Sequence, residues 1–259
     1  MTPALLALMG LGQNAALLAV AVFLRVGAAM ALLPAFGAQS VPVRVRLGLT
    51  LAFTAVVAPA VAGLAPGVPA DPGGLLAFLG VETVAGLALG FSVRVFIWML
   101  QVAGTIAAQA VSLSQILGGS GVDPQPAMAQ LLMVAGLALA AMTGLHVRVA
   151  EALILSYDAL PMGGQLPSAT LAEWATARVA AMFGSAFAFA APFVISSVIY
   201  NLTLGVINRA MPQLMVAFVG APAITAAGLV LLFVTAPILL PAWLGLLHGR
   251  LADPFGMGP

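Results

Sequence analysis

The sequence predicts an all-α membrane protein, built of helical hairpins with broken apolar helices. Of its 259 residues 63% are hydrophobic and only 6% are charged, whereas a soluble domain carries about 25% charged residues. Several long stretches carry no charge, and a helix of roughly 20 apolar residues crosses a bilayer. Helices satisfy their own backbone polar groups in lipid. The net charge is +1 and the basic residues are scattered, which argues against a nucleic-acid partner.

Two membrane-spanning helices joined by a polar bend are predicted in the first part of the chain. We expect the helices at residues 15–35 and 47–65, and the bend at residues 37–46. Arg44 and Arg46 lie in this bend. The positive-inside rule therefore places the bend in the cytoplasm and the N-terminus across the membrane.

Arg25 lies in the middle of the first predicted helix and has no acidic residue within one helical turn. A charge at that depth costs a few kcal/mol unless it is paired or hydrated. We therefore expect Arg25 to meet a carboxylate or a carbonyl elsewhere, in this chain or in another one.

The next apolar stretch, residues 75–117, is too long for one membrane span and contains Glu82 and Arg94. We predict two helices or one bent hairpin, with a break in residues 94–104. Glu82 and Arg94 lie about three turns apart, so they face in similar directions. They could line a polar path or a subunit contact, or they could pair and extend toward the helix ends. Arg148 and Glu151, three residues apart, are expected to pair locally.

A flexible glycine run, Gly118-Gly119-Ser120-Gly121, follows and leads to a turn signal at Asp123-Pro124. A helix at residues 126–155 comes next. In the last third, residues 179–208 and 210–247 carry no charge. The second of these stretches would measure about 57 Å as one helix. Because Pro212, Pro222, Pro237 and Pro241 interrupt it, we predict a hairpin or a broken helix. In total, six or seven helical segments are expected.

The sequence contains no recognisable arrangement of catalytic residues. The two histidines are far apart in sequence, and the chain has no cysteine, so neither a metal site nor a thiol nucleophile is indicated. The glycine run lacks the Lys-Ser ending of a phosphate-binding loop. We expect no enzyme, no metal and no cofactor.

Three segments carry prolines, glycines, arginines or glutamines in a particular order along the chain. They are Pro34-Ala35-Phe36-Gly37 with residues 40–49, Gly90-Phe91-Ser92-Val93-Arg94 leading to Asp123-Pro124-Gln125, and Asn208-Arg209-Ala210-Met211-Pro212-Gln213-Leu214 with Gly220-Ala221-Pro222. In this order over the whole chain, they resemble the FliR family of flagellar export proteins, called SctT in virulence injectisomes.

The resemblance implies a FliP-like half joined to a FliQ-like half, in one domain covering residues 1–259. Such a protein is present as one copy in a helical export gate with FliP-like and FliQ-like subunits, together with FlhB-like and FlhA-like export proteins. The gate lies in the bacterial inner membrane within the flagellar basal body, and unfolded rod, hook and filament subunits leave the cytoplasm through it. Much of the gate lies above the bilayer plane, so the predicted helices need not be literal membrane crossings.

The resemblance also implies roles for particular residues. The family's loop between the middle helices projects into the channel and helps to close it. Its counterpart here is a plug loop of Ser112, Leu113, Ile116, Leu117, Gly118, Gly119 and Asp123. The glycines depart from the bulkier residues of the family. Subunit contacts or helix breaks are implied for Arg44, Arg46, Arg209, Pro212 and Gln213.

Two alternatives to a flagellar gate subunit remain at this point. An injectisome homologue would have the same fold and a different cargo. A stand-alone secondary transporter would also have broken helices and buried charges, although the sequence contains no convincing internal repeat.

Overall fold

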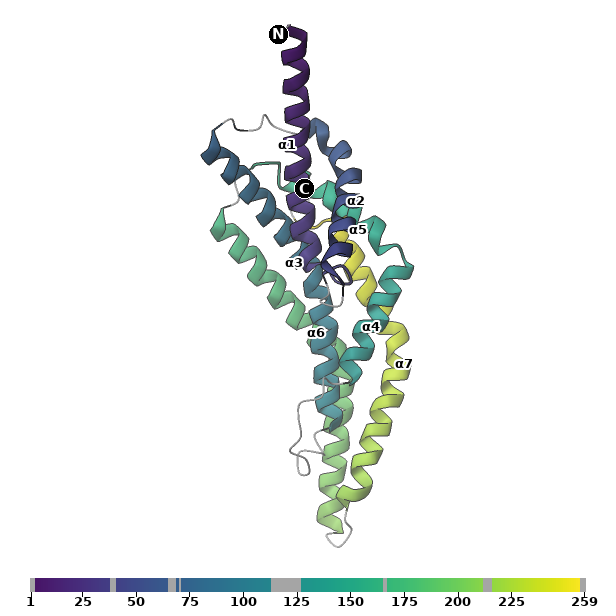
Figure 1. The fold of residues 1–259 in the computed structure, drawn as a ribbon. Helices are drawn as coiled ribbons and strands as arrows, with labels where there is room; N and C mark the ends of the chain where they lie inside the picture. The colour runs from purple at the N-terminus through teal and green to yellow at the C-terminus, as the bar shows by residue number, and fades with distance from the viewer. Residues whose placement is uncertain are drawn as a thin grey trace. The chain divides into compact units, whose positions relative to one another are not determined.

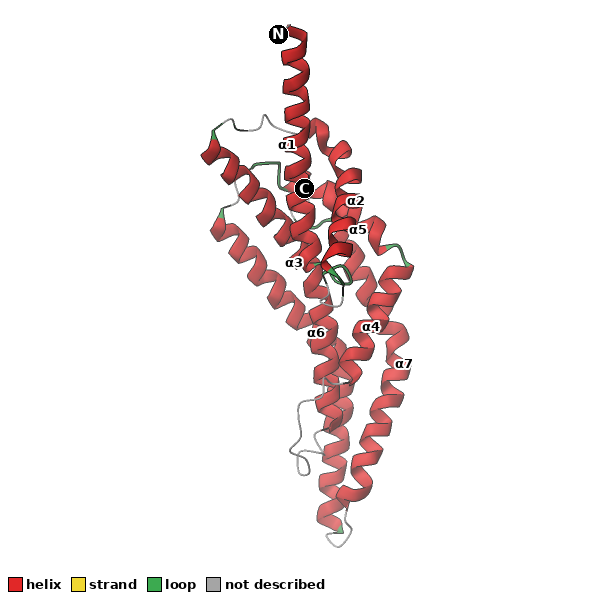
Figure 2. Cartoon of the chain, in the orientation of Figure 1, coloured by secondary structure: helices red, strands yellow, loops and turns green. Residues whose placement is uncertain are grey.

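The computed structural model describes residues 3–37, 41–64, 69, 71–112, 127–164, 167–211 and 216–256. Every regular element in these ranges is a helix (Figures 1 and 2). The helices are α1 Pro3–Leu32, α2 Val43–Val61, the short 3-10 helix η1 Ala62–Leu64, α3 Pro72–Ser112, α4 Ala127–Met142, α5 Leu145–Ala159, α6 Ser168–Ala210 and α7 Val216–Ala252. Five are long and apolar enough to cross a membrane, or six if the broken pair α4–α5 forms one span. The predicted all-α membrane fold is confirmed.

The chain divides into two compact units, and each is described by itself. The first unit comprises Met1–Val95, Ala141–Arg178 and Leu246–Pro259, and the second comprises Phe96–Ala140 and Val179–Gly245. Helices α3, α6 and α7 each contribute to both units, and the last two residues of α4 also fall in the first unit.

In the first unit, one face of α1 is fully buried at a helical spacing. The residues of this face, together with Leu33 directly after the helix, are at most 1% exposed: Ala21, Val22, Arg25, Val26, Ala29, Met30 and Leu33. Helix α3 approaches this face through two glycines. A methyl group at Gly86 would overlap the carbonyl oxygen of Arg25, and one at Gly90 would lie 2.6 Å from the carbonyl oxygen of Ala29. The small residues therefore let the two backbones come into contact.

The bend after α1 is closed by backbone and side-chain hydrogen bonds. Ala35 has a left-handed φ of 67°, and the Gly37 N–H donates to the carbonyl of Leu33 at 2.7 Å. Helix α2 begins directly after Pro42, so Arg44 and Arg46 lie in its first turn and not in the bend as predicted. Proline suits a helix start because the first N–H groups have no partner within the helix. From this turn the Arg46 Nε donates to the carbonyl of Phe36 at 3.3 Å.

The predicted break in residues 94–104 is wrong, because α3 is one helix of 41 residues. Gly104, within the suspected region, has another function. A methyl group there would overlap Ala129 of α4, so this glycine allows close helix packing. The charges of α3 do not interrupt it either, since Glu82 is paired within the first unit.

The helix break among the described residues lies at Gly144 and not at the predicted positions. The helix expected at residues 126–155 is divided into α4 and α5, because Gly144 adopts a left-handed φ of 81° before α5. Conversely, α7 is one helix of 37 residues and contains Pro222, Pro237 and Pro241. Proline fixes φ near the helical value and removes one hydrogen bond, a loss that membrane helices tolerate. Pro212 lies outside the described residues.

The close approach of α1 and α3 yields a stability prediction. Gly86→Ala should lower the free energy of unfolding by about 1–3 kcal/mol, because the added methyl group must push α3 away from Arg25. The control is Gly80→Ala on the same helix, where an added methyl group meets nothing within 4 Å. It should be neutral or stabilise by at most about 1 kcal/mol. Reversible unfolding in mixed micelles, followed by circular dichroism, measures both. Equal effects of the two changes would contradict the packing argument.

Candidate functional site

The first unit contains a fully buried ion pair between α1 and α3. Arg25 and Glu82 have side chains that are 0% exposed. The Arg25 Nε donates to Glu82 Oε2 at 2.8 Å, and Nη2 donates to Oε1 at 3.1 Å. This bidentate geometry matches the planar guanidinium to the carboxylate and is the strong form of such a pair.

The remaining hydrogen-bonding capacity of Arg25 is used at the end of α5. Its Nη1 donates to the carbonyl of Ser156 at 3.3 Å and to the Ser156 hydroxyl at 3.2 Å. Its Nη2 also donates to the carbonyl of Leu160 at 3.0 Å. A guanidinium has five N–H donors, so these bonds and the two to Glu82 engage the whole group. The guanidinium carbon also lies 3.7 Å from the centre of the Tyr157 ring.

Glu82 is equally well satisfied. Besides Arg25, its Oε1 accepts the backbone N–H of Gly163 at 2.9 Å. Gly163 lies in the turn after α5 with a left-handed φ of 67°, and a methyl group there would overlap the Phe78 ring. The ion pair therefore joins α1, α3, the end of α5 and the following turn. Both charges are buried and their hydrogen-bonding capacity is used within the chain, so the ion pair holds the fold and offers no free charge to a ligand.

The expectation that Arg25 meets a carboxylate or carbonyl is confirmed, since it meets both within this chain. Glu82 pairs with Arg25 and not with Arg94, which is half-buried. The local pair of Arg148 and Glu151 is not formed in the described part of the chain: Arg148 is half-buried and Glu151 is exposed.

In the second unit, α3 packs against α4, and the two helices run in opposite directions. A methyl group at Gly136 would lie 2.5 Å from Leu100, and one at Gly104 would overlap Ala129. Between these points the Gln101 Nε2 donates to the Met133 sulfur at 3.0 Å. The described residues before and after the segment 113–126 therefore belong to a tightly packed helix pair.

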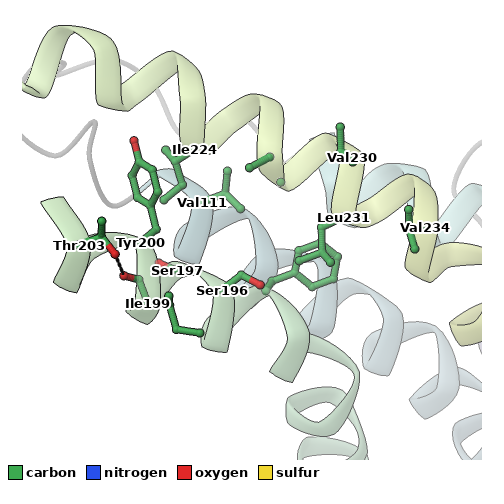
Figure 3. A pocket seen from close by; sticks show the side chains of 13 residues that line it. Val111, Ser196, Ser197, Ile199, Tyr200, Thr203, Ile224, Val230, Leu231 and Val234 are labelled. Carbon is green, nitrogen blue, oxygen red and sulfur yellow. Dashed lines mark hydrogen bonds between the residues drawn. The ribbon is translucent and has the colours of Figure 1, made fainter.

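The end of α3 is also fixed by α6 and α7. The Ser197 hydroxyl of α6 donates to the carbonyl of Ala110 at 2.6 Å, and a methyl group at Gly228 of α7 would lie 2.6 Å from Val111. At the start of α7, the carbonyl of Gly220 accepts a hydrogen bond from the Tyr200 hydroxyl at 2.6 Å. A cavity of about 570 Å³ lies among these helices. Its lining is mostly aliphatic side chains of α6 and α7, with Val111 of α3 and a few hydroxyl groups (Figure 3).

Of the residues implied by the family resemblance, the structure describes Arg44, Arg46, Ser112 and Arg209. Ser112 is the last residue of α3, whereas Leu113, Ile116, Leu117, Gly118, Gly119 and Asp123 lie outside the described residues. Arg44 is exposed in the first turn of α2, and Arg46 is half-buried beside the preceding bend. Arg209 is exposed near the end of α6, and Pro212 and Gln213 lie outside the described residues.

Sequence reasoning missed the α5 side of the buried cluster. Ser156, Tyr157 and Gly163 are ordinary residues in an apolar or turn context, and Leu160 contributes only its carbonyl. The sequence feature that could have indicated this side of the cluster is the dipeptide Gly163-Gly164, which lies in the turn after α5. Such a turn can present a backbone N–H to a buried carboxylate.

Comparison with known proteins identifies relatives over most of the chain. The model of a family described as bacterial export proteins, family 1, matches residues 16–249. The chain is 32% identical over 224 residues to flagellar biosynthetic protein FliR of Caulobacter vibrioides, covering 86% of this chain and 89% of the relative. It is 28% identical over 228 residues to the Escherichia coli protein of that name, covering 84% of each. For the Bacillus subtilis protein of that name the identity is 27% over 224 residues, covering 84% and 85%.

The buried pair yields a second stability prediction. Glu82→Gln should lower the free energy of unfolding by about 3–5 kcal/mol, because Arg25 is left as an uncompensated buried charge. Combining Arg25→Met with Glu82→Leu should recover part of this loss, since neither charge is then buried. Glu151→Gln, which removes an exposed carboxylate of α5, is the control and should have little effect. Unfolding of the four proteins in mixed micelles measures the difference. A Glu82→Gln variant as stable as the control would refute the role of the pair.

Proposed function

Because the chain belongs to family 1 of the bacterial export proteins, and within it to the FliR family, we propose that it is a core channel subunit of the flagellar export gate. Family membership makes it a component of a flagellar export apparatus. Its apolar helices make it a membrane protein. The proposal adds that the chain lines the path by which unfolded rod, hook and filament subunits leave the cytoplasm across the inner membrane, without an enzymatic step or a cofactor of its own.

One structural observation supports the channel role most directly. The segment of residues 113–126 is glycine-rich, and the helices on both of its sides are held by close contacts between α3 and α4. A loop that closes a channel needs fixed ends, so that it takes the same position each time the channel closes. Its middle part must be able to move aside when a substrate passes. In this proposal residues 112–123 form the closure of the gate.

The lengths of the apolar helices support a place within a larger assembly. The uncharged part of α6, residues 179–208, measures about 45 Å along its axis, and the hydrocarbon core is about 30 Å thick. Outside one buried stripe of α6, large apolar side chains such as Phe187 and Leu202 are 59% and 70% exposed. Apolar surface that extends beyond the hydrocarbon needs a protein cover. We propose that FliP-like and FliQ-like subunits provide it around one copy of this chain, with FlhB-like and FlhA-like proteins nearby.

The alternatives are weighed by the same observations. Relatives named for flagellar biosynthesis favour a flagellar gate over an injectisome gate. A stand-alone transporter would have to place the long apolar faces of α6 and α7 in lipid alone. No contact among the described residues favours that arrangement.

Assembly is tested by native mass spectrometry of the tagged chain, co-expressed with its neighbouring membrane-protein genes. We expect one copy of the chain in a complex with FliP-like and FliQ-like chains. Replacing Arg209, Pro212 and Gln213 together by alanine should reduce the yield of this complex and motility, because these residues are proposed to form the break and subunit contact after α6. The control Thr176→Ala removes an exposed hydroxyl of the same helix. A stable monomer or homodimer that does not bind the FliP-like and FliQ-like chains would favour the transporter. Full assembly of the triple variant would refute the proposed subunit contact.

Closure is tested by deleting residues 118–121 from the assembled gate. We expect complex assembly to be retained and ion leakage through the gate to rise, because the shortened loop can no longer reach across the channel. Replacing Gly118, Gly119 and Gly121 by serine keeps the length and flexibility and should leave leakage near the wild-type level. An intact complex with unchanged leakage after the deletion would contradict the closure role.

A further inference from the structure

Helices α3 and α4 of the second unit carry a row of uncharged polar side chains. Gln101, Thr105 and Gln109 follow one another on α3 at intervals of four residues, and none of the three is buried. Residues four apart are neighbours on one face of a helix. On α4, the exposed Gln130 lies three residues before Met133, which contacts Gln101, so Gln130 lies beside the row of α3. These four side chains form what we call the polar face.

The polar face contrasts with the exposed surface of α6 and α7 in the same unit. That surface is dominated by large apolar side chains, such as Phe187, Leu202 and Phe233, which are 59%, 70% and 81% exposed. In the described part of α3 within this unit, the only large apolar side chain that is exposed is Trp98, at 37%. Residues 96–112 and 127–140 also contain no charge. The polar face therefore meets water or a polar partner that requires no charge.

The polar face offers hydrogen-bond donors and acceptors together. A glutamine amide has both. The Gln101 Nε2 donates to the Met133 sulfur at 3.0 Å, but a thioether is a weak acceptor and a better one can replace it. The Thr105 hydroxyl donates to the carbonyl of Gln101 at 2.8 Å and keeps its lone pairs for a further donor. Because a peptide backbone also carries one donor and one acceptor for most residues, it is complementary to this face.

The spacing of the row fits an extended chain. Intervals of four residues along α3 correspond to about 6 Å. An extended polypeptide repeats every two residues, or about 6.7 Å, and one of its edges presents the N–H and C=O of every second residue. Gln101, Thr105 and Gln109 can therefore meet consecutive backbone groups along one edge, whatever the side chains of that polypeptide are.

The two exposed glutamines flank the segment of residues 113–126. Gln109 lies three residues before Ser112, the last residue of α3, and Gln130 lies three residues after Ala127, the first residue of α4. The polar face thus extends along α3 toward the segment that we propose closes the channel.

We propose that Gln101, Thr105, Gln109 and Gln130 bind the backbone of the extended polypeptide in transit. This inference rests on the proposed channel role and specifies how the passing chain is met. Hydrogen bonds to the backbone do not depend on the cargo's sequence, and a face without charge neither attracts nor repels acidic or basic cargo.

Contact is tested in cells with an export substrate fused to a tightly folded protein, which stalls the chain in the assembled gate. A photocrosslinking amino acid replaces Gln109, Gln130 or, as the control, Phe187 on the exposed apolar surface of α6. A fourth position, Gly119, reports on the channel role alone. We expect crosslinks to the stalled substrate from positions 109 and 130 and none from position 187.

Hydrogen bonding is tested with the double variant Gln109→Leu and Gln130→Leu, which removes both exposed amides at similar side-chain size. The export rate should fall by about tenfold, the factor for one lost hydrogen bond, and equally for acidic and basic substrates. Thr105→Val should cause a smaller loss. Its matched control is Thr203→Val of α6, because both hydroxyls donate to the carbonyl four residues earlier in their own helix. The control should export at the wild-type rate, and native mass spectrometry verifies that each variant assembles.

The four crosslinking positions separate this inference from the channel role. Crosslinks from position 119 without any from 109 and 130 would overturn the polar face and leave the channel role standing. An assembled gate with no crosslink from any of the four positions would overturn both. Equal crosslinking from position 187, or wild-type export by the assembled double leucine variant, would also overturn the polar face. A loss confined to acidic or to basic substrates would refute binding through the backbone.

Discussion

The first unit depends on the ion pair between Arg25 and Glu82. Burying two charges costs several kcal/mol for each ion, and only well-formed hydrogen bonds offset this cost. Here the bidentate contact has that geometry, and the end of α5 provides the remaining acceptors. The pair therefore admits one register of α1 against α3 and one position of the turn at Gly163. Gly86 and Gly90 are necessary to it, because only a close backbone approach lets these side chains meet.

The sequence predicted what Arg25 needs, but not the position of its partner. A lone charge in an apolar helix requires an acceptor, and this reasoning was correct. Local spacing then suggested Glu82 with Arg94, whereas the real pair joins residues 57 positions apart. Such a contact is set by helix packing. Gly86 and Gly90 have the small-xxx-small spacing that allows close helix packing, but in a chain with 28 glycines this weak match does not identify α1 as the neighbour.

The predicted positions of the helix breaks are wrong for a related reason. Charges in α3 and prolines in α7 were read as interruptions, but a charge that finds a partner and a proline whose φ fits the helix both leave it continuous. The interruption at Gly144 depends on a left-handed backbone conformation, which composition does not reveal. The plug loop and the residues Pro212 and Gln213 rest on family resemblance alone, since the described residues stop at each side of them.

The buried polar groups and the exposed apolar faces of the helices have different roles in this chain. Several interior hydroxyl groups are satisfied locally: Ser197 and Tyr200 donate to backbone carbonyls of other helices, and Thr54 and Thr235 donate to carbonyls of their own helix. These bonds fix geometry but leave nothing for a partner. The outer apolar faces of α6 and α7 are the reverse, because they carry large exposed side chains over more length than a bilayer covers. Association must therefore be driven by apolar contact outside, while the buried polar bonds hold the helices that present it. Helices held in this way keep their geometry, while their outer apolar faces stay available for contact.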